Sequence, residues 1–253
     1  QKFDDLTVVG VGSGPLSNYG LSSERSLLEI MGLVDPIINY SKITKFRKKL
    51  IKDFIKEDID IFIGIDAPDF NFEIHKQMQK EGIKTVHVVC PSVWAWRPGR
   101  VKHFKHVDYM LCLFPFELEY CANVRKQAFC IGHPLIDEKE AYENEFKDNV
   151  VCIMPGSRKS EIKNNLDVMI DGFNQFNFEE NFRAVIPVYK KEDKYLIQHK
   201  IQDHKFITCE HVQSAEVLKK SKAAVVCSGT ATLETLLAEI PTTVVYKTNW
   251  FNH

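Results

Sequence analysis

The chain has 253 residues, 44% of them hydrophobic and 26% charged, and its 33 basic and 34 acidic side chains leave a formal net charge of −1. This balance excludes a disordered chain, a collagen-like chain and a small disulfide-rich protein, and it lacks the basic excess that indicates a nucleic-acid partner. No apolar run reaches about 18 residues, so the sequence predicts no membrane-spanning helix. The length fits two medium-sized domains.

In the first half of the chain, short apolar runs alternate with stretches of helical spacing. Five runs have the length and composition of strands: 6–11, 61–65, 85–90, 109–114 and 128–131. In the Lys-rich segment before the second run, apolar residues recur every three or four positions, at Ile43, Phe46, Leu50 and Phe54, which predicts an amphipathic helix. Strands separated by helices predict a parallel sheet that is covered on both faces.

The second half of the chain repeats this alternation after an acidic segment, 138–149, which predicts a linker or an exposed helix. Strands are predicted at 150–154, 184–188, 206–209, 223–227 and 242–246, and helices at 159–176, 217–220 and 233–238. We therefore expect an α/β protein of two parallel-sheet domains, the first spanning 1–148 and the second 149–253.

The seven cysteines are odd in number and include no C-x-x-C pair, which argues against a zinc site and a redox motif. Five of them lie in or beside strand-like runs: Cys90, Cys112, Cys130, Cys152 and Cys227. Such cysteines typically act as reduced, buried hydrophobic residues, which fits a reducing compartment. The start of the chain has no signal-peptide pattern, so the predicted location is the cytoplasm.

Ligands of parallel α/β sheets bind at the carboxyl ends of the strands, so the residues after each strand are the candidates for function. Asp66 follows the run 61–65, and Pro68 can begin the next helix. Two interpretations of Asp66 stay open: a general base whose pKa is held up by partial burial, or an N-cap of that helix. Asp69, in the first turn, fits the helix dipole.

Aromatic and imidazole side chains follow the next strands of the first half. Trp94, Trp96 and Arg97 lie in one loop, where they either form a wall for a sugar or amphipathic ligand or close the edge of the sheet. His133 follows the run 128–131 and either donates a hydrogen bond to a ligand or has a structural role.

Two loops in the second half have the composition of phosphate-binding sites. Gly156, Ser157 and Arg158 lead from a strand into a helix, where backbone N–H groups and a guanidinium favour an anion. A second loop of the same type contains the small or hydroxyl residues Ser228, Gly229, Thr230 and Thr232. Glu234, one turn later, is placed to accept hydrogen bonds from ribose hydroxyls. Two such loops in one domain predict a single nucleotide site.

Neither a metal nor a cofactor is expected. The Asp58-x-Asp60 pair resembles a metal-binding pair, but it precedes its strand and therefore lies at the wrong end. The early glycine loop has Pro15 where a dinucleotide-binding motif needs its third glycine.

Taken in order, six of these segments resemble the motifs of the lipid-A-disaccharide synthase family: 64–70, 91–97, 114–117, 132–135, 155–158 and 228–234. The sequences IDAPDFN and PSVWAWR are specific to that family, whereas SGTATLE is shared with other sugar-nucleotide transferases. The resemblance implies a GT-B glycosyltransferase with two Rossmann-like domains facing across a cleft. It also implies an inverting transfer of 2,3-diacylglucosamine from its UDP derivative to 2,3-diacylglucosamine 1-phosphate, with Asp66 as the catalytic base and no metal.

The family pattern also starts earlier and continues further than this chain. The resemblance therefore implies that both domains are incomplete, and we expect the 253-residue chain to be inactive by itself. The acyl substrates imply a peripheral position on the anionic inner membrane, through an apolar segment, 30–38, beside a Lys-rich one, 42–56. The other interpretation of this region is an ordinary amphipathic helix. The sequence leaves open whether the chain forms a homodimer.

Two other functions remain open alongside this one. The first is another UDP-sugar transferase or epimerase of the same fold, such as the peptidoglycan glucosaminyltransferase. The second is a truncated remnant that binds UDP without turnover.

Overall fold

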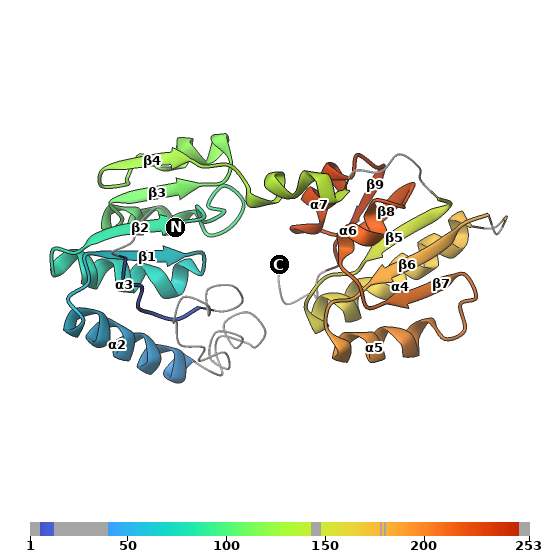
Figure 1. The fold of residues 1–253 in the computed structure, drawn as a ribbon, viewed down its shortest axis with the longest axis horizontal. Helices are drawn as coiled ribbons and strands as arrows, with labels where there is room; N and C mark the ends of the chain where they lie inside the picture. Colours follow the sequence, from blue (N-terminus) through green and yellow to red (C-terminus); the bar gives the residue numbers. More distant parts are fainter. Residues whose placement is uncertain (1–5, 13–39, 143–147, 178, 180, 248–253) are drawn as a thin grey trace. The chain divides into compact units, whose positions relative to one another are not determined.

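The computed structural model describes residues 6–12, 40–142, 148–177, 179 and 181–247. The chain divides into two compact units, residues 1–133 and 134–253. Each unit contains its own parallel sheet (Figure 1).

The first unit has a four-stranded parallel sheet of order β1-β2-β3-β4. Its elements are α2 (Tyr40–Lys56), β1 (Ile61–Ile65), α3 (Pro68–Lys80), β2 (Lys84–Val88), η2 (Pro98–His106), β3 (Tyr109–Cys112), η3 (Pro115–Tyr120) and β4 (Gln127–Cys130). Because consecutive strands are neighbours in the sheet, the segments that follow them line one edge in chain order.

One face of this sheet is packed against helices. Phe46, Leu50 and Phe54 form the buried stripe of α2, as their spacing predicts, and they pack in one cluster with Phe62 of β1 and Met78 of α3. The opposite face differs from the prediction, because Ile61, Ile63 and Ile65 of β1 are each about half exposed. In the described part of this unit, the outer face of β1 is therefore not covered.

The second unit has a five-stranded parallel sheet of order β7-β6-β5-β8-β9. Its elements are η4 (Pro134–Tyr142), β5 (Val150–Met154), α4 (Lys159–Phe176), β6 (Arg183–Pro187), α5 (Lys191–Ile201), β7 (Ile207–Glu210), α6 (Ser214–Leu218), β8 (Ala223–Cys227), α7 (Ala231–Leu237) and β9 (Thr242–Val245).

This second sheet is covered on both faces, as predicted. Val151 and Ile153 of the central strand β5 pack into the cluster formed with α4 and α5. Cys152 and Met154, which alternate with them, pack into the cluster formed with α6 and α7. Every residue of β5 is buried, which is the pattern of a strand between two helical layers.

The structure also differs from the sequence prediction in the run 6–11 and in the domain boundary. The run 6–11 is not a strand, because only Val11 forms an isolated bridge. The acidic segment begins within η4, a mostly exposed helix as one of its two interpretations predicts, and η4 contacts α6 and α7 and belongs to the second unit. The compact units accordingly divide between His133 and Pro134, whereas the composition placed the change of domain at 148–149. Among the described helices, none combines the length and apolarity that crossing a bilayer needs.

Candidate active site

Four candidate segments of the first unit lie at the carboxyl edge of its sheet. Asp66 follows β1, the segment 91–97 follows β2, the segment 114–117 follows β3, and His133 comes after β4. The parallel order of the strands brings these segments together, although 67 residues separate the first from the last in the sequence numbering (66 to 133).

Asp66 sits on a strained turn. Asp66 and Ala67 have φ angles of 48° and 41°, in the left-handed region. Two successive non-glycine residues there cost about 1–3 kcal/mol each, a feature that concentrates at functional sites. The turn is held by Asn71, whose side-chain amide donates to the carbonyl of Asp66 at 2.7 Å and to that of Ile65 at 3.2 Å.

The N-cap interpretation of Asp66 is wrong. Ala67 is the N-cap residue of α3, and no side chain caps the helix. The Asp66 carboxylate is exposed and has no hydrogen-bond partner among the described residues, so these residues do not supply the partial burial that the general-base interpretation invoked. The carboxylate is presented by a strained turn at the edge of the sheet.

Two buried histidines lie close to Gly64, two residues before Asp66. His75 Nε2 and His87 Nδ1 lie 3.0 Å apart, and a Cβ atom on Gly64 would approach His75 Nε2 to 2.9 Å. Burial lowers the pKa of His75 to about 2 and that of His87 to about 4, so both rings are neutral at physiological pH. The sequence prediction missed Asn71 and both histidines; polar side chains on otherwise apolar element faces were the available signal.

A row of aromatic rings joins the ends of β2, β3 and β4. The Trp94 ring meets that of Phe116 edge-on at 4.8 Å, and Phe116 stacks on Phe114 at 5.8 Å. Phe114 in turn lies 5.7 Å from the His133 ring. The row therefore connects two residues that the sequence singled out, and Trp94 and Phe116 remain more than one-third exposed.

Arg97 is anchored beside this row. Its guanidinium lies over the Trp96 ring at 5.1 Å and donates to the Asp69 carboxylate at 3.0 Å. Arg100 donates to the same carboxylate at 2.6 Å and 3.1 Å. Asp69 thus ties the loop after β2 to the start of α3, beyond the helix-dipole role expected of it. Trp96 is 57% exposed and does not close the sheet edge.

The two phosphate-type loops of the second unit follow neighbouring strands. β5 and β8 are paired in parallel, with Met154 opposite Val226, so the loops 155–158 and 228–232 leave the same edge of the sheet side by side. Asn165 connects these exits with the one after β9. Its amide donates to the Pro155 carbonyl at 3.3 Å and to Cys227 Sγ at 3.4 Å, and its oxygen accepts from the Lys247 backbone N–H at 2.8 Å. The sequence prediction missed this buried residue.

A carboxylate occupies the first loop. Glu161 accepts from the backbone N–H groups of Ser157 at 3.0 Å and Arg158 at 3.2 Å, and from the Arg158 guanidinium at 2.7 Å. Gly156 makes this approach possible, because its φ is 117° and a Cβ atom would lie 2.6 Å from a Glu161 carboxylate oxygen. The donors assigned to phosphate therefore hold an anionic group of the chain itself.

The second loop is open. Ser228, Gly229 and Thr230 are exposed, and the Thr232 hydroxyl donates to the Gly229 carbonyl at 2.7 Å. The Glu234 carboxylate accepts a hydrogen bond from the Ser214 hydroxyl. It also lies near Tyr142, whose pKa is raised to about 12 by burial and then by the charge of Glu234.

Comparison with known proteins identifies the family of this chain. The family model described as lipid-A-disaccharide synthetase matches residues 1–253. The lipid-A-disaccharide synthase of Francisella tularensis subsp. novicida (strain U112) is 34% identical over an alignment that covers 100% of this chain and 71% of the relative. The enzyme of Francisella tularensis subsp. tularensis (strain WY96-3418) is 33% identical over the same shares.

The chain belongs to the lipid-A-disaccharide synthetase family. The solved structures that resemble this chain have the GT-B fold. A UDP co-structure of MnaA from S. aureus superposes with a TM-score of 0.63 at 14% identity, covering 94% of this chain and 71% of MnaA. The UDP-GlcNAc 2-epimerase of Methanocaldococcus jannaschii superposes with a TM-score of 0.58 at 13% identity, covering 93% and 82%. At this identity the likeness concerns the fold alone.

Proposed function

We propose that this chain transfers 2,3-diacylglucosamine from its UDP derivative to 2,3-diacylglucosamine 1-phosphate, giving the lipid A disaccharide 1-phosphate and UDP. The observation that carries the proposal is the family match along the whole chain, together with an exposed Asp66 on a strained turn at the carboxyl edge of the first sheet. The family assignment makes the chain a glycosyltransferase of lipid A synthesis.

Asp66 is the proposed catalytic base. Its carboxylate takes the proton of the acceptor 6-hydroxyl, the oxygen attacks the anomeric carbon, and the bond to UDP breaks with its electrons leaving on the diphosphate. A single displacement of this kind inverts the anomeric centre. The turn held by Asn71 is already in place before substrate arrives, so little reorganisation is needed when the proton moves.

The loops 155–158 and 228–232 are the proposed diphosphate site. The backbone N–H groups of Ser157 and Arg158 and the Arg158 guanidinium stabilise the charge that develops on UDP, after its phosphate displaces the Glu161 carboxylate. Gly229 and Thr230 line the neighbouring loop. Glu234 is proposed for the ribose, where a hydroxyl would compete with Ser214 for the carboxylate.

The aromatic row is the proposed contact surface for the glucosamine rings. Trp94 offers a partly exposed face, Arg97 provides a positive charge beside it, and His133 lies at the other end of the row. The alternation of apolar faces and charged edges suits a sugar ring with a phosphate.

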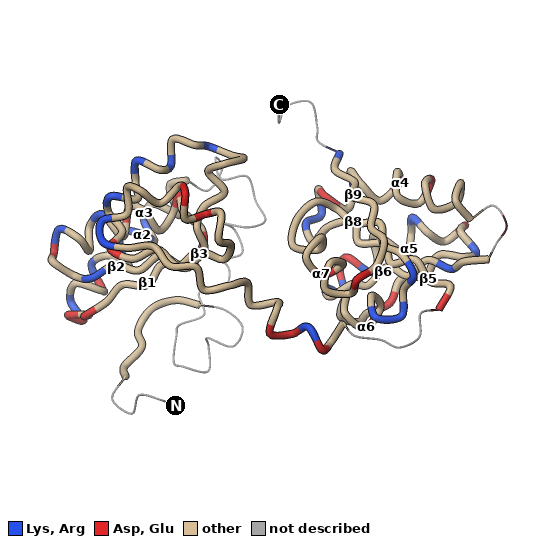
Figure 2. The backbone as a smooth tube through the Cα atoms, turned by 90° about the horizontal axis from the view of Figure 1, so that it is seen from above, with Lys and Arg blue, Asp and Glu red and all other residues tan. Residues whose placement is uncertain are grey.

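We also propose a peripheral position on an anionic membrane surface. The lysines of α2 are exposed, and Figure 2 marks basic positions in blue along the chain in the α2 and α3 region of the first unit. The buried stripe of α2 packs into its own unit, which is the pattern of an ordinary amphipathic helix. The apolar segment 30–38 lies outside the described residues, and the homodimer stays a prediction.

The test compares two carboxylate substitutions in this chain, assayed with both acyl sugars. Asp66→Asn removes the base, and Asp60→Asn, before β1 at the opposite end of the strand, is the control. Loss of a general base lowers kcat by about 10²–10⁴-fold. We expect that loss for Asp66→Asn only; turnover within a few-fold of the unsubstituted enzyme would show that Asp66 is not the base.

Measuring UDP binding beside turnover separates the remaining functions. Binding with turnover of both acyl sugars supports the proposal. Binding without turnover in the 253-residue chain indicates a nucleotide-binding remnant, and interconversion of UDP-N-acetylglucosamine without transfer indicates an epimerase of the same fold. Absence of UDP binding would refute the assignment of the two loops.

A further inference from the structure

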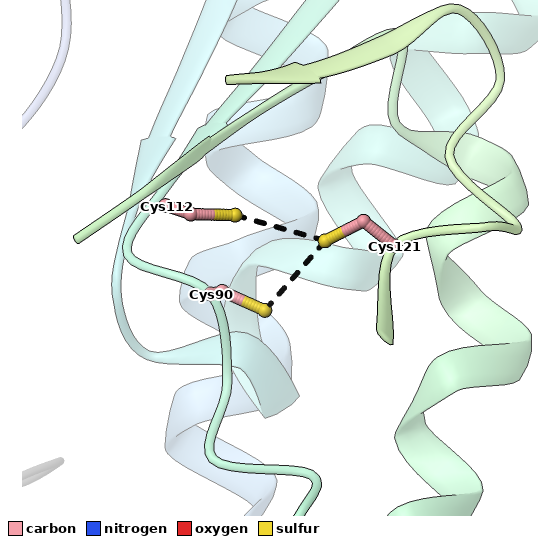
Figure 3. Close-up of side chains that lie close together, drawn as sticks. All are labelled: Cys90, Cys112 and Cys121. Atoms are coloured by element: carbon pink, nitrogen blue, oxygen red, sulfur yellow. Dashed lines mark hydrogen bonds between the residues drawn. The ribbon is translucent and has the colours of Figure 1, made fainter. Parts of the chain in front are cut away.

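Three cysteines from separate segments of the first unit meet inside its core. Cys90 follows β2, Cys112 ends β3, and Cys121 follows η3. The Sγ atoms of Cys112 and Cys121 lie 3.7 Å apart, and those of Cys90 and Cys121 lie 4.0 Å apart. All three sulfur atoms fall within 4.8 Å of one another, and Figure 3 shows the three side chains pointing toward a common centre.

This spacing is that of sulfur ligands around one metal ion. Thiolates bind zinc at about 2.3 Å, and three sulfur atoms at that distance around an ion in their plane are about 4.0 Å apart. We propose that Cys90, Cys112 and Cys121 form a three-coordinate site for one soft, thiophilic cation, with Cu(I) as the cellular ion that fits.

The surroundings favour three ligands over four. Among the described residues, no histidine, aspartate, glutamate or further cysteine joins the group. The thiols lie in an apolar cluster with Phe72, Val93, Phe104, Val107 and Met110, which disfavours a fourth water ligand. Structural zinc is almost always four-coordinate, whereas thiolates also select Cu(I).

Uptake of Cu(I) needs the three side chains as thiolates. It therefore releases up to three protons from the reduced thiols and changes no oxidation state. Cys121 is the most exposed of the three, at 6%, and provides the entry point.

A bound ion would connect the loops that follow β2 and β3 in the first unit. Cys90 immediately precedes the loop 91–97, and Cys112 immediately precedes the segment 113–117, whose turn is held by the Glu117 carboxylate accepting from Leu113 at 2.8 Å. An ion bound by all three thiolates fixes these segments to the end of η3. Because the folded core holds the three thiols together, Cu(I) is expected to bind it more tightly than the unfolded chain and to raise the Tm.

A disulfide is the alternative chemistry of this cluster. It would draw two sulfur atoms from 3.7 Å to about 2.05 Å and leave the third unpaired. It also needs an oxidant, whereas cation binding needs only the reduced thiols.

The test is anaerobic titration of the reduced 253-residue chain with Cu(I), in competition with a chromophoric Cu(I) chelator. We expect one tightly bound Cu(I) per chain. Cys112→Ala and Cys121→Ser should weaken binding by more than roughly 100-fold, the upper limit for losing an outer-shell partner of a metal ligand. Cys152→Ala, a fully buried cysteine outside the cluster, is the matched control and should bind like the unsubstituted chain.

X-ray absorption spectroscopy of the unsubstituted chain with Cu(I) supports the test if a cluster variant fails to fold, with three sulfur scatterers per ion as the expected result. Equal uptake by Cys112→Ala would overturn the proposal, because the ion would then sit on thiols outside the cluster. No uptake, two sulfur scatterers per ion, or a disulfide that forms in its place would overturn it as well.

Discussion

Replacing Glu161 by Ala should tighten UDP binding while it destabilises the second unit. The Glu161 carboxylate now occupies the donors proposed for the diphosphate, so UDP must displace it. The ion pair with Arg158 involves a side chain that is 58% exposed, which limits it to below about 1 kcal/mol. The two backbone N–H groups add the contribution of a helix cap, about 1 kcal/mol. The carboxylate is therefore held by about 1–2 kcal/mol.

That free energy has two measurable consequences. The free energy of unfolding of the variant, followed by urea, should fall by about 1–2 kcal/mol, because the N–H groups lose their acceptor. UDP affinity, followed by calorimetry, should rise by roughly 5- to 30-fold, because the Glu161 carboxylate no longer competes for the loop's N–H groups. Glu192→Ala, in the first turn of α5, is the control and should leave UDP affinity unchanged. Unchanged or weaker UDP binding by Glu161→Ala would refute the reasoning that the carboxylate marks the phosphate position.

Three further predictions concern the first unit. Asn71→Ala removes both hydrogen bonds that hold the turn at Asp66, so the free energy of unfolding measured in urea titrations should fall by about 1–3 kcal/mol. The kcat of the variant should fall by a larger factor than its KM rises. An unchanged unfolding midpoint would contradict this role of Asn71. Burial lowers the pKa of His75 and His87 below the unfolded value of 6.5, so the stability that depends on their neutral rings should be complete above pH 6.5 and be lost as pH falls through about 4. In urea titrations between pH 7 and pH 4, His87→Gln should reduce the dependence of the unfolding midpoint on pH. The same dependence in the variant and the unsubstituted chain would contradict this assignment. Trp94→Ala breaks an aromatic pair that contributes about 0.5–1.5 kcal/mol and should raise the KM for the acceptor sugar more than it changes kcat, with an unchanged KM counting against the aromatic row.

The positions of the candidate residues could be predicted, because the carboxyl ends of parallel strands lie at the same edge of a sheet. Asp66, Trp94 and His133 follow strands of the first sheet, and Arg158 follows a strand of the second. The alternation of apolar runs and helical stretches predicts parallel sheets from local hydrophobicity. The family resemblance, read from the order of the motifs, agrees with the match along the whole chain.

Partners of individual side chains could not be predicted in the same way. The sequence permits Glu161 to reach back to its own helix start or to leave those donors to a ligand. The structure shows the carboxylate on the donors, in space that a side chain at Gly156 would fill. The N-cap interpretation of Asp66 was wrong because it also depends on backbone conformation: a left-handed turn at Asp66 and Ala67 places Ala67 at the N-cap position.

The sequence by itself determined the class of fold, the strand ends at which the candidates lie, and the family. The tertiary structure decided which residues from distant segments touch: Asn165 between three strand exits, the aromatic row from Trp94 to His133, and the three thiols of the core. The physical reason is that periodicity and turn chemistry act over a few neighbouring residues. Contacts between separate elements depend on strand order and register, which packing of the complete sheet selects.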